Sequence, residues 1–222
     1  MFGAWQAGAW RSLATRFKPD LVVGASVGSL NGYAIAAGWS ASDLCAWWQR
    51  SDVAGFEHLP KAIRLLMDAR PLEIEYAVVL VDLLRMKPHT VTGSVIQAEH
   101  LLASCAVPGA ALPRRIGGRW YLDGGLLNPL PVWAAVELGA TRILALNAFP
   151  DVPSALLQPL VKGFRACFGH RPALPPIVDL TTLAPSRPLG SLRDAFRWKQ
   201  ANIERWIEQG AADAANLGIA PD

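Results

Sequence analysis

The sequence between residues 21 and 38 constrains the fold more than any other stretch. A short run of apolar, mostly β-branched residues at 21–23 leads into the motif Gly-x-Ser-x-Gly at 24–28, and an alanine-rich stretch follows. This order predicts a strand, a tight turn and a helix, an arrangement that places a serine on a strained bend beside the positive end of a helix. We therefore interpret Ser26 as a candidate nucleophile.

The two glycines of this motif, Gly24 and Gly28, suit a bend at which backbone segments approach closely, because a Cβ atom at either position would crowd the turn. The alternative interpretation is a glycine-rich corner that contains a serine by coincidence. Glycine accounts for only 19 of the 222 residues. This spacing therefore seldom arises by chance, and the expected strand and helix on either side make a coincidence rarer still.

Composition indicates one folded domain without a membrane-spanning helix. The chain has 222 residues, of which 52% are hydrophobic and 18% are charged, so it can bury a core and is too apolar for a disordered chain. We expect residues 1–222 to form a single domain. The longest apolar run, residues 77–84, is interrupted by Asp82 and is far shorter than the ~20 residues that span a bilayer. The N-terminus lacks the features of a secretory signal, so we expect a cytoplasmic protein.

Charge and cysteine content argue against several classes of function. The net charge is +3, but the basic residues are scattered, so nucleic-acid binding receives little support. Cys45, Cys105 and Cys167 lie far apart in the sequence, which favours neither a disulfide framework nor a zinc site. We expect the cysteines to be buried apolar residues and expect no bound metal.

The remaining sequence alternates helix and strand signals, which is typical of an α/β fold. The Gly-Gly pair at 117–118, between two strand-like runs, predicts a hairpin over residues 114–122. Residues 149–176 are rich in proline, and we interpret them as a loop. The other expected elements are helices over residues 3–16, 27–37, 40–50, 98–106, 132–138 and 192–215, and strands over residues 77–84, 90–92, 141–147 and 177–180.

A serine hydroxyl needs a base to remove its proton, and Asp123 is the best candidate for that base. Asp123 follows the second strand of the hairpin and precedes Gly124 and Gly125, which leave its carboxylate unobstructed. The alternative interpretation is a turn aspartate, because Asp-Gly is a common turn pair. The residues alone leave both interpretations open.

Histidine is the usual base of serine hydrolases, and the usual order of serine, acid and histidine selects His170. The other histidines are His58, His89 and His100. His170 lies in the proline-rich stretch, where no strand end holds its imidazole, and a single histidine in a loop is more often a surface residue. A triad of Ser26, Asp123 and His170 is therefore kept as an alternative.

Four segments of the chain together resemble the patatin-like phospholipase family. They are Gly-Ala-Ser-Val-Gly at 24–28, Asp-Ala-Arg-Pro-Leu at 68–72, Ala-Ser-Cys-Ala-Val-Pro-Gly at 103–109 and Tyr-Leu-Asp-Gly-Gly-Leu-Leu-Asn-Pro-Leu-Pro at 121–131. The likeness runs from Gly3 through the final helix. Each motif by itself is moderately specific, whereas their common order and spacing make the resemblance strong.

The resemblance implies a three-layer α/β/α fold with a mostly parallel central sheet. It also implies a dyad, in which Ser26 attacks an acyl ester carbonyl and Asp123 accepts the serine proton. Water would then hydrolyse the acyl-enzyme. The implied substrates are phospholipids and other lipid acyl esters, and the family's bacterial-type members need no metal or organic cofactor.

The sequence departs from the family at its N-terminus. The family carries a glycine-rich loop whose backbone N–H groups hold the negative oxygen of the tetrahedral intermediate, and here only Gly3 corresponds to it. The implied oxyanion donors are therefore the amides of Val27 and Gly3, and losing one such donor typically costs about 10²- to 10³-fold in rate. We expect an N-terminally truncated hydrolase. The alternative is a catalytically impaired family member that binds lipid or a partner protein.

The 9 tryptophans suit both protein cores and the headgroup region of membranes. We expect most of them to lie in the core. Contact of Trp39, Trp47 or Trp48 with a membrane surface is a further hypothesis, which would place the protein at the periphery of a membrane.

Overall fold

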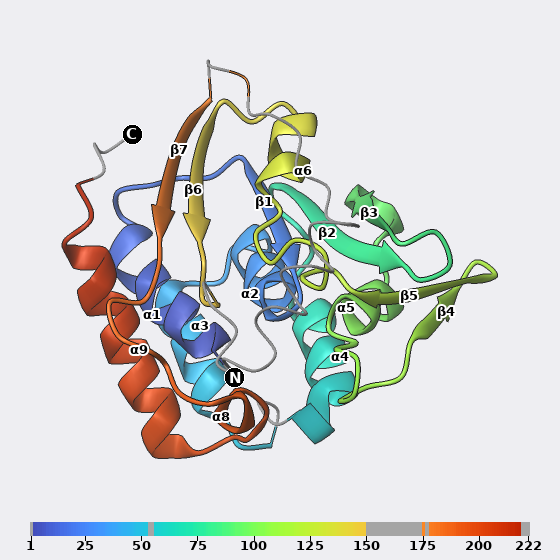
Figure 1. Cartoon of the computed structure of the whole chain (residues 1–222). Helices are drawn as coiled ribbons and strands as arrows, with labels where there is room; N and C mark the ends of the chain where they lie inside the picture. Colours follow the sequence, from blue (N-terminus) through green and yellow to red (C-terminus); the bar gives the residue numbers. More distant parts are fainter. Residues whose placement is uncertain (1, 53–55, 150–174, 176–177, 219–222) are drawn as a thin grey trace.

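The computed structural model describes residues 2–52, 56–149, 175 and 178–218 (Figure 1). Helices and strands alternate along much of the chain, as expected for an α/β fold. In chain order the elements are α1 (Gly3–Leu13), β1 (Leu21–Ala25), α2 (Val27–Ala36), α3 (Ala41–Gln49), the 3₁₀ helix η1 (Phe56–His58), α4 (Leu59–Ala69), β2 (Glu75–Asp82), β3 (Lys87–Thr92), the 3₁₀ helix η2 (Gly93–Val95), α5 (Ala98–Ser104), β4 (Arg114–Ile116), β5 (Arg119–Asp123), α6 (Val132–Glu137), β6 (Arg142–Leu146), β7 (Asp179–Leu183), α8 (Leu192–Phe196) and α9 (Gln200–Ala215).

Strand β2 is the centre of the larger sheet. Residues 77–79 of β2 pair with both β1 and β3, and residues 80–82 pair with both β3 and β5. Strand β3 therefore occupies one edge of β2, while β1 and β5 share the other edge. Strand β1 runs parallel to β2 and β5 runs antiparallel to it. The carboxyl ends of β1 and β5 consequently meet beside Val79 and Leu80.

The α/β fold in three layers is confirmed, and its strand directions are mixed. Strands β1 and β2 are parallel, as are β6 and β7 in a second, two-stranded sheet. The pairings β2–β3, β2–β5 and β4–β5 are antiparallel. Strand β1 returns to β2 through helices, as parallel pairs require, whereas tight turns allow only antiparallel pairs. The parallel arrangement that we expected is therefore found in the pairs β1–β2 and β6–β7. The other pairs of the larger sheet are antiparallel.

Helices lie on both faces of the larger sheet (Figure 1). Successive residues of β2 pack on opposite faces: Tyr76, Val78 and Leu80 belong to the main core, whereas Val79 and Val81 belong to two smaller clusters. The main core includes residues of α1 to α5 and α9, and the cluster around Val79 includes residues of α6. This alternation of strand side chains separates the helical layers.

Helices α1 and α9 pack so closely that glycine is required at two contacts. A Cβ atom at Gly8 would overlap the carbonyl oxygen of Ile207, and a Cβ atom at Gly210 would overlap the carbonyl oxygen of Trp5. The indole Nε1 of Trp5 also donates a hydrogen bond of 2.8 Å to Asp213. The last helix of the described chain is thus held directly against the first.

The expected helix over residues 192–215 is wrong, because the chain forms two helices there. Arg197 and Lys199 have extended backbone conformations and separate α8 from α9. The break lets the indole of Trp198 donate a hydrogen bond of 3.2 Å to the carbonyl of Trp48. Helix α4 was not anticipated. The loop interpretation for residues 149–176 concerns a stretch of which only 149 and 175 are described.

The hairpin over residues 114–122 is confirmed as β4 and β5. Gly117 and Gly118 form its turn with φ values of 55° and 81°, a conformation that glycine adopts without strain.

Most tryptophans belong to the core, as expected. Buried indoles are those of Trp5, Trp10, Trp47, Trp48, Trp133 and Trp206. Membrane contact through Trp47 or Trp48 is therefore wrong, because their side chains pack against each other edge to face and are only 5% and 2% exposed. Trp39 is half-buried, so its contact with a membrane surface stays a hypothesis. Within the part of the chain that the structure describes, no helix combines the length and apolarity needed to cross a bilayer.

Gly210→Ala should destabilise the protein, because the added Cβ would push the backbone of α1 away at Trp5. Overpacking of this kind typically costs about 1–3 kcal/mol, and up to about 1 kcal/mol is regained because alanine favours a helix more than glycine does. Urea unfolding would measure the change. Gly218→Ala is the control, because nothing lies within 4 Å of its added Cβ, and it should change the free energy of unfolding by less than about 0.5 kcal/mol. Equal stabilities would contradict this account of the interface.

Candidate active site

Ser26 occupies the turn between β1 and α2, as its motif predicts. Its φ of 52° and ψ of −134° lie outside the regions that L-residues favour, and hydrogen bonds hold both of its backbone groups. The N–H donates to Oγ of Ser104 at 2.9 Å, and the carbonyl accepts from the N–H and the Oγ of Ser29 at 2.9 and 2.6 Å. The strained turn therefore presents a half-buried serine at the start of a helix.

The two glycines of the motif have different roles. A Cβ atom at Gly24 would lie 2.5 Å from Cα of Ser29 and 2.6 Å from the carbonyl oxygen of Gly28, so Gly24 is needed for close approach, as predicted. A Cβ atom at Gly28 would lie 3.7 Å from Nε2 of Gln6, which is an ordinary contact. The prediction of crowding at Gly28 is therefore wrong, because a Cβ atom there would point toward the side chain of Gln6 and not into the backbone of the turn.

Ser104 connects three parts of the site. Its buried Oγ accepts the hydrogen bond from Ser26 and donates one of 2.8 Å to the carbonyl of Val79 in β2. Its carbonyl accepts a hydrogen bond of 3.3 Å from the N–H of Gly124. The sequence analysis quoted Ser104 only within a motif and gave it no role. The available signal was a single small polar residue directly after the apolar run at 101–103.

Asp123 ends β5 opposite Leu80 and is only 5% exposed. Its Oδ1 accepts a hydrogen bond of 2.7 Å from the N–H of Gly125, which orients the carboxylate. A Cβ atom placed on Gly125 would lie 3.1 Å from that Oδ1 and 4.0 Å from Cβ of Ser26. The carboxylate of Asp123 and the side chain of Ser26 thus both lie next to the same point. The distance from Oδ1 of Asp123 to Cβ of Ser26 therefore cannot exceed the sum of these two distances.

The glycines after Asp123 make this approach possible. A Cβ atom at Gly124 would overlap the carbonyl oxygen of Val79 and would lie 3.3 Å from Cβ of Ala25. At Gly125, any side chain would enter the space between Asp123 and Ser26. Both glycines therefore support the site sterically, as the sequence analysis expected.

Gly3 and Val27, the expected oxyanion donors, lie side by side. A Cβ atom at Gly3 would lie 2.5 Å from Cγ2 of Val27 and would overlap the ring of Trp48. Gly3 begins α1 and Val27 begins α2, and the first amides of a helix have no acceptor within it. Two helix starts thus meet beside Ser26. The assignment of these two amides to an oxyanion hole stays a prediction.

A buried asparagine that the sequence analysis missed holds the start of α1 in place. The Nδ2 of Asn31 donates hydrogen bonds to the carbonyl of Gly3 at 2.9 Å and to Oε1 of Gln6 at 3.0 Å, and its Oδ1 accepts one of 2.7 Å from the indole of Trp48. Gln6 donates onward to the carbonyl of Leu146 in β6 at 2.9 Å. Asn31 therefore links α1, α2 and α3.

Three of the four histidines lie among the described residues and have contacts or positions of their own. His89 of β3 stacks on Tyr121 with ring centres 5.4 Å apart, and burial is the main cause that lowers its pKa. The Nδ1 of His100 accepts a backbone hydrogen bond at the start of α5, and His58 precedes α4. His170 lies outside the described residues, so the triad alternative stays a prediction.

Cys105 follows Ser104 and is buried. Burial, and to a smaller extent the Asp123 carboxylate, raises the pKa of its thiol to about 12. The thiol is therefore neutral near neutral pH and is no competing nucleophile. Cys45 is buried as expected, while Cys167 lies outside the described residues. In the described ranges, no group of histidine, cysteine and acidic side chains could hold a metal ion.

Ser104→Ala should destabilise the protein by about 1–3 kcal/mol, because the N–H of Ser26 and the carbonyl of Val79 would both lose their hydroxyl partner in a buried place. The change would be measured by urea unfolding. Ser94→Ala is the matched control, since Ser94 is exposed, and its effect should stay within about 0.5 kcal/mol. A neutral effect of Ser104→Ala would show that the turn does not depend on this hydroxyl.

Comparison with known proteins identifies the family of the chain. The family model of patatin-like phospholipases matches residues 1–90 and 85–136, a span that contains both Ser26 and Asp123. Uncharacterized NTE family proteins of Mycobacterium bovis and Mycobacterium tuberculosis are 29% identical to the chain over 66% of its length. The aligned region covers 49% of each relative, so the chain spans about half the length of these curated relatives. The family match extends over more than half of the chain, and the chain therefore belongs to the patatin-like phospholipase family.

Proposed function

We propose that this protein is a lipid acyl hydrolase in which Ser26 is the nucleophile and Asp123 is the general base. Membership of the patatin-like phospholipase family supports the class of reaction. The observation that carries the residue assignment is the convergence of Oδ1 of Asp123 and Cβ of Ser26 on the space beside Gly125.

In the proposed reaction, Asp123 takes the proton of the Ser26 hydroxyl while Oγ attacks the ester carbonyl. The tetrahedral intermediate collapses, and the alcohol leaves with the proton that Asp123 held. The product of this half-reaction is an acyl ester on Ser26. A water molecule then loses a proton to Asp123 and attacks this ester, and collapse of the second intermediate releases the fatty acid and returns the proton to Ser26.

Burial of the dyad supports this chemistry. A carboxylate in water is a weak base for a serine hydroxyl, so a dyad depends on the exclusion of water from the reacting groups. Asp123 is only 5% exposed, and the N–H of Gly125 fixes the orientation of its carboxylate. Ser26 is half-buried, so an ester can still reach its hydroxyl.

The proposal assigns the oxyanion site to the two helix starts beside Ser26. The amide of Val27 follows the nucleophile and lies at the positive end of α2. The amide of Gly3 is the second donor, and the hydrogen bonds of Asn31 hold that end of α1 close to α2. These two donors would stabilise the negative oxygen of both tetrahedral intermediates.

A second candidate function is binding of lipid or of a partner protein without hydrolysis. It differs from the first candidate because it needs neither the hydroxyl of Ser26 nor the carboxylate of Asp123. A Ser26–Asp123–His170 esterase is a third candidate, distinguished by the effect of His170→Ala on turnover.

Ser26→Ala should abolish labelling by a fluorophosphonate probe and hydrolysis of a p-nitrophenyl acyl ester, because the probe and the ester both need the serine oxygen. Asp123→Asn should lower turnover by about 10²- to 10⁴-fold, the usual contribution of a general base. Asp82→Asn is the matched control, since Asp82 is also a buried aspartate, 6% exposed, but contacts the backbone after β2.

Equal labelling of the wild-type protein and Ser26→Ala would contradict the assignment of the nucleophile. Equal losses in Asp123→Asn and Asp82→Asn would contradict the role of Asp123 as a base. Absence of labelling and turnover in the folded wild-type protein would favour the non-catalytic candidate.

A further inference from the structure

Two large apolar side chains are exposed on neighbouring segments of the larger sheet. Leu84 lies in the turn between β2 and β3 and is 80% exposed, and Trp120 lies in β5 and is 42% exposed. The two segments are adjacent, because the N–H of Leu83 donates a hydrogen bond of 2.9 Å to the carbonyl of Trp120. Apolar surface therefore faces solvent where the turn passes β5.

An apolar cluster covers one face of the sheet at this point. Its members are buried or half-buried, and they are Val81, Leu83, Met86, Leu122, Leu126 and Leu127. Side chains two positions apart on a strand share a face, so Trp120 lies on the same face as Leu122. Arg115 lies on that face as well, because it pairs with Trp120 across the hairpin. The exposed indole thus extends the cluster toward the tip of the hairpin.

Positive charge is concentrated in the same part of the chain. Residues 83–122 contain five basic residues and one acidic residue, Glu99, a net charge of +4, whereas the whole chain has a net charge of +3. The basic residues are Arg85, Lys87, Arg114, Arg115 and Arg119, and all except the half-buried Arg114 are exposed. Among the described residues, none of the five takes part in an ion pair. Their charge is therefore available to an anionic partner.

A buried carboxylate orders the turn that carries Leu84. Asp82 is only 6% exposed, and its Oδ1 accepts hydrogen bonds of 3.2 and 3.1 Å from the N–H groups of Leu84 and Arg85. This acceptor fixes the backbone of the turn from below. The protein thus holds an exposed leucine next to an exposed arginine in a defined conformation.

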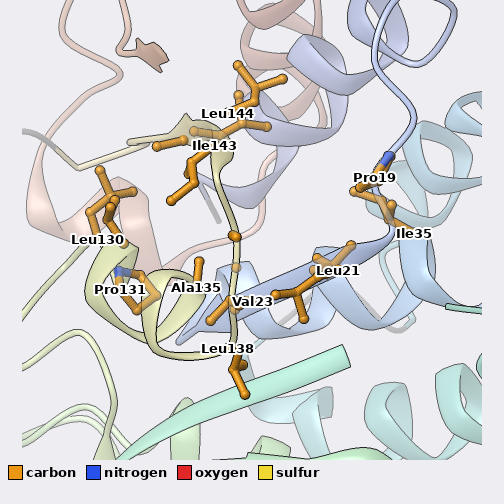
Figure 2. A pocket seen from close by; sticks show the side chains of 18 of the residues that line it. Pro19, Leu21, Val23, Ile35, Leu130, Pro131, Ala135, Leu138, Ile143 and Leu144 are labelled. Carbon is orange, nitrogen blue, oxygen red and sulfur yellow. The ribbon is translucent and has the colours of Figure 1, made fainter. Parts of the chain in front are cut away.

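The turn after β2 and the β4–β5 hairpin project together from the body of the protein, and both extend to the right in Figure 1. A cavity of about 730 Å³ lies between β1 and β6 (Figure 2), and no residue between 81 and 123 lines it. A small molecule is normally bound in an enclosing cavity. A projecting surface with apolar and cationic side chains suits a membrane interface, where the former enter the headgroup region and the latter meet anionic headgroups.

We propose that residues 83–87 and 114–120, here called the docking surface, bind a bilayer that contains anionic phospholipids. Leu84 and Trp120 enter the interface, a region in which indole rings are favoured. The exposed cations of the docking surface lie around them and contact the anionic headgroups, and their apolar stems cover further apolar area.

The docking surface is continuous with the loop that follows the candidate base. Leu126 and Leu127 come directly after Gly125 and belong to the apolar cluster that Trp120 extends. A bilayer bound by the docking surface is therefore close to the loop that bears the candidate site. Docking needs neither the hydroxyl of Ser26 nor hydrolysis, so this inference is independent of the proposed function.

Cosedimentation with sucrose-loaded vesicles tests the proposal. The protein carries Ser26→Ala, so that the lipid stays intact whether or not the wild-type protein hydrolyses it. Vesicles of phosphatidylcholine and phosphatidylglycerol should bind at least about tenfold more tightly than vesicles of phosphatidylcholine alone, and added salt should weaken this binding. Equal affinities for the two kinds of vesicle, or no binding to the anionic vesicles, would overturn the proposal.

Two arginine variants in the same background locate the charge that matters. Arg115 and Arg64 are both exposed, but Arg64 lies on α4, which packs on the opposite face of the larger sheet. Arg115→Gln should weaken binding to anionic vesicles by about fivefold, the usual contribution of one cation near an anionic surface. Arg64→Gln should bind like its parent. Equal effects of the two variants would overturn the assignment of the surface.

Two further variants test whether apolar side chains enter the bilayer. Val95 is 63% exposed and lies in η2, beyond the end of β3 that is farther from the docking surface. Leu84→Ser should weaken vesicle binding by about threefold or more, and Val95→Ser should not. A loss in Arg115→Gln without a loss in Leu84→Ser would show attraction without insertion, which would overturn the proposal in favour of an acidic protein partner.

Tryptophan emission gives an independent measure of insertion. Anionic vesicles should shift the emission to shorter wavelengths, because the indole of Trp120 leaves water. Trp120→Phe should remove most of this shift, and Trp39→Phe should retain it. A shift that is lost in Trp39→Phe and kept in Trp120→Phe would overturn the proposal and assign membrane contact to Trp39.

Discussion

One edge of β2 receives two strands from opposite directions, and the candidate active site depends on this constraint. Strand β1 runs parallel to β2 and ends opposite Val79, while β5 runs antiparallel and ends opposite Leu80. The two carboxyl ends can meet only because the strands arrive from opposite sides. Ser26 and Asp123, at these ends, are therefore neighbours in space although most of the α/β unit and the hairpin lie between them in the sequence.

The meeting of these strand ends requires small residues around it. Gly24 and Gly124 lie where a Cβ atom would collide with backbone, and Ser104 fills the remaining space with a hydroxyl that serves Ser26 and Val79 together. A residue with the backbone strain of Ser26 costs on the order of 1–3 kcal/mol and persists only where its surroundings over-determine it. The hydrogen bonds from Ser26 to Ser104 and from Ser29 to Ser26 supply that constraint.

Local signals predicted the parts of the fold that neighbouring residues determine. The turn at Ser26 and the hairpin at 117–118 depend on glycine within a few positions, so both are readable from the sequence. The break between α8 and α9 could not be predicted from the sequence, because the spacing of apolar residues continues across it. The break is accompanied by a hydrogen bond from Trp198 to Trp48, which is 150 positions away. The contacts of Asn31 are likewise made with other helices, and the direction of β5 relative to β2 depends on a pairing between distant segments.

Strand β1, which leads to Ser26, pairs with another described strand on only one of its two edges. Strand β1 bonds to β2 on one side, whereas its other side faces the cavity toward β6. The Ser26 turn is the direct continuation of β1, so the stiffness of this strand sets how firmly the strained turn is held. The geometry of the proposed dyad thus depends on the backbone of one five-residue strand.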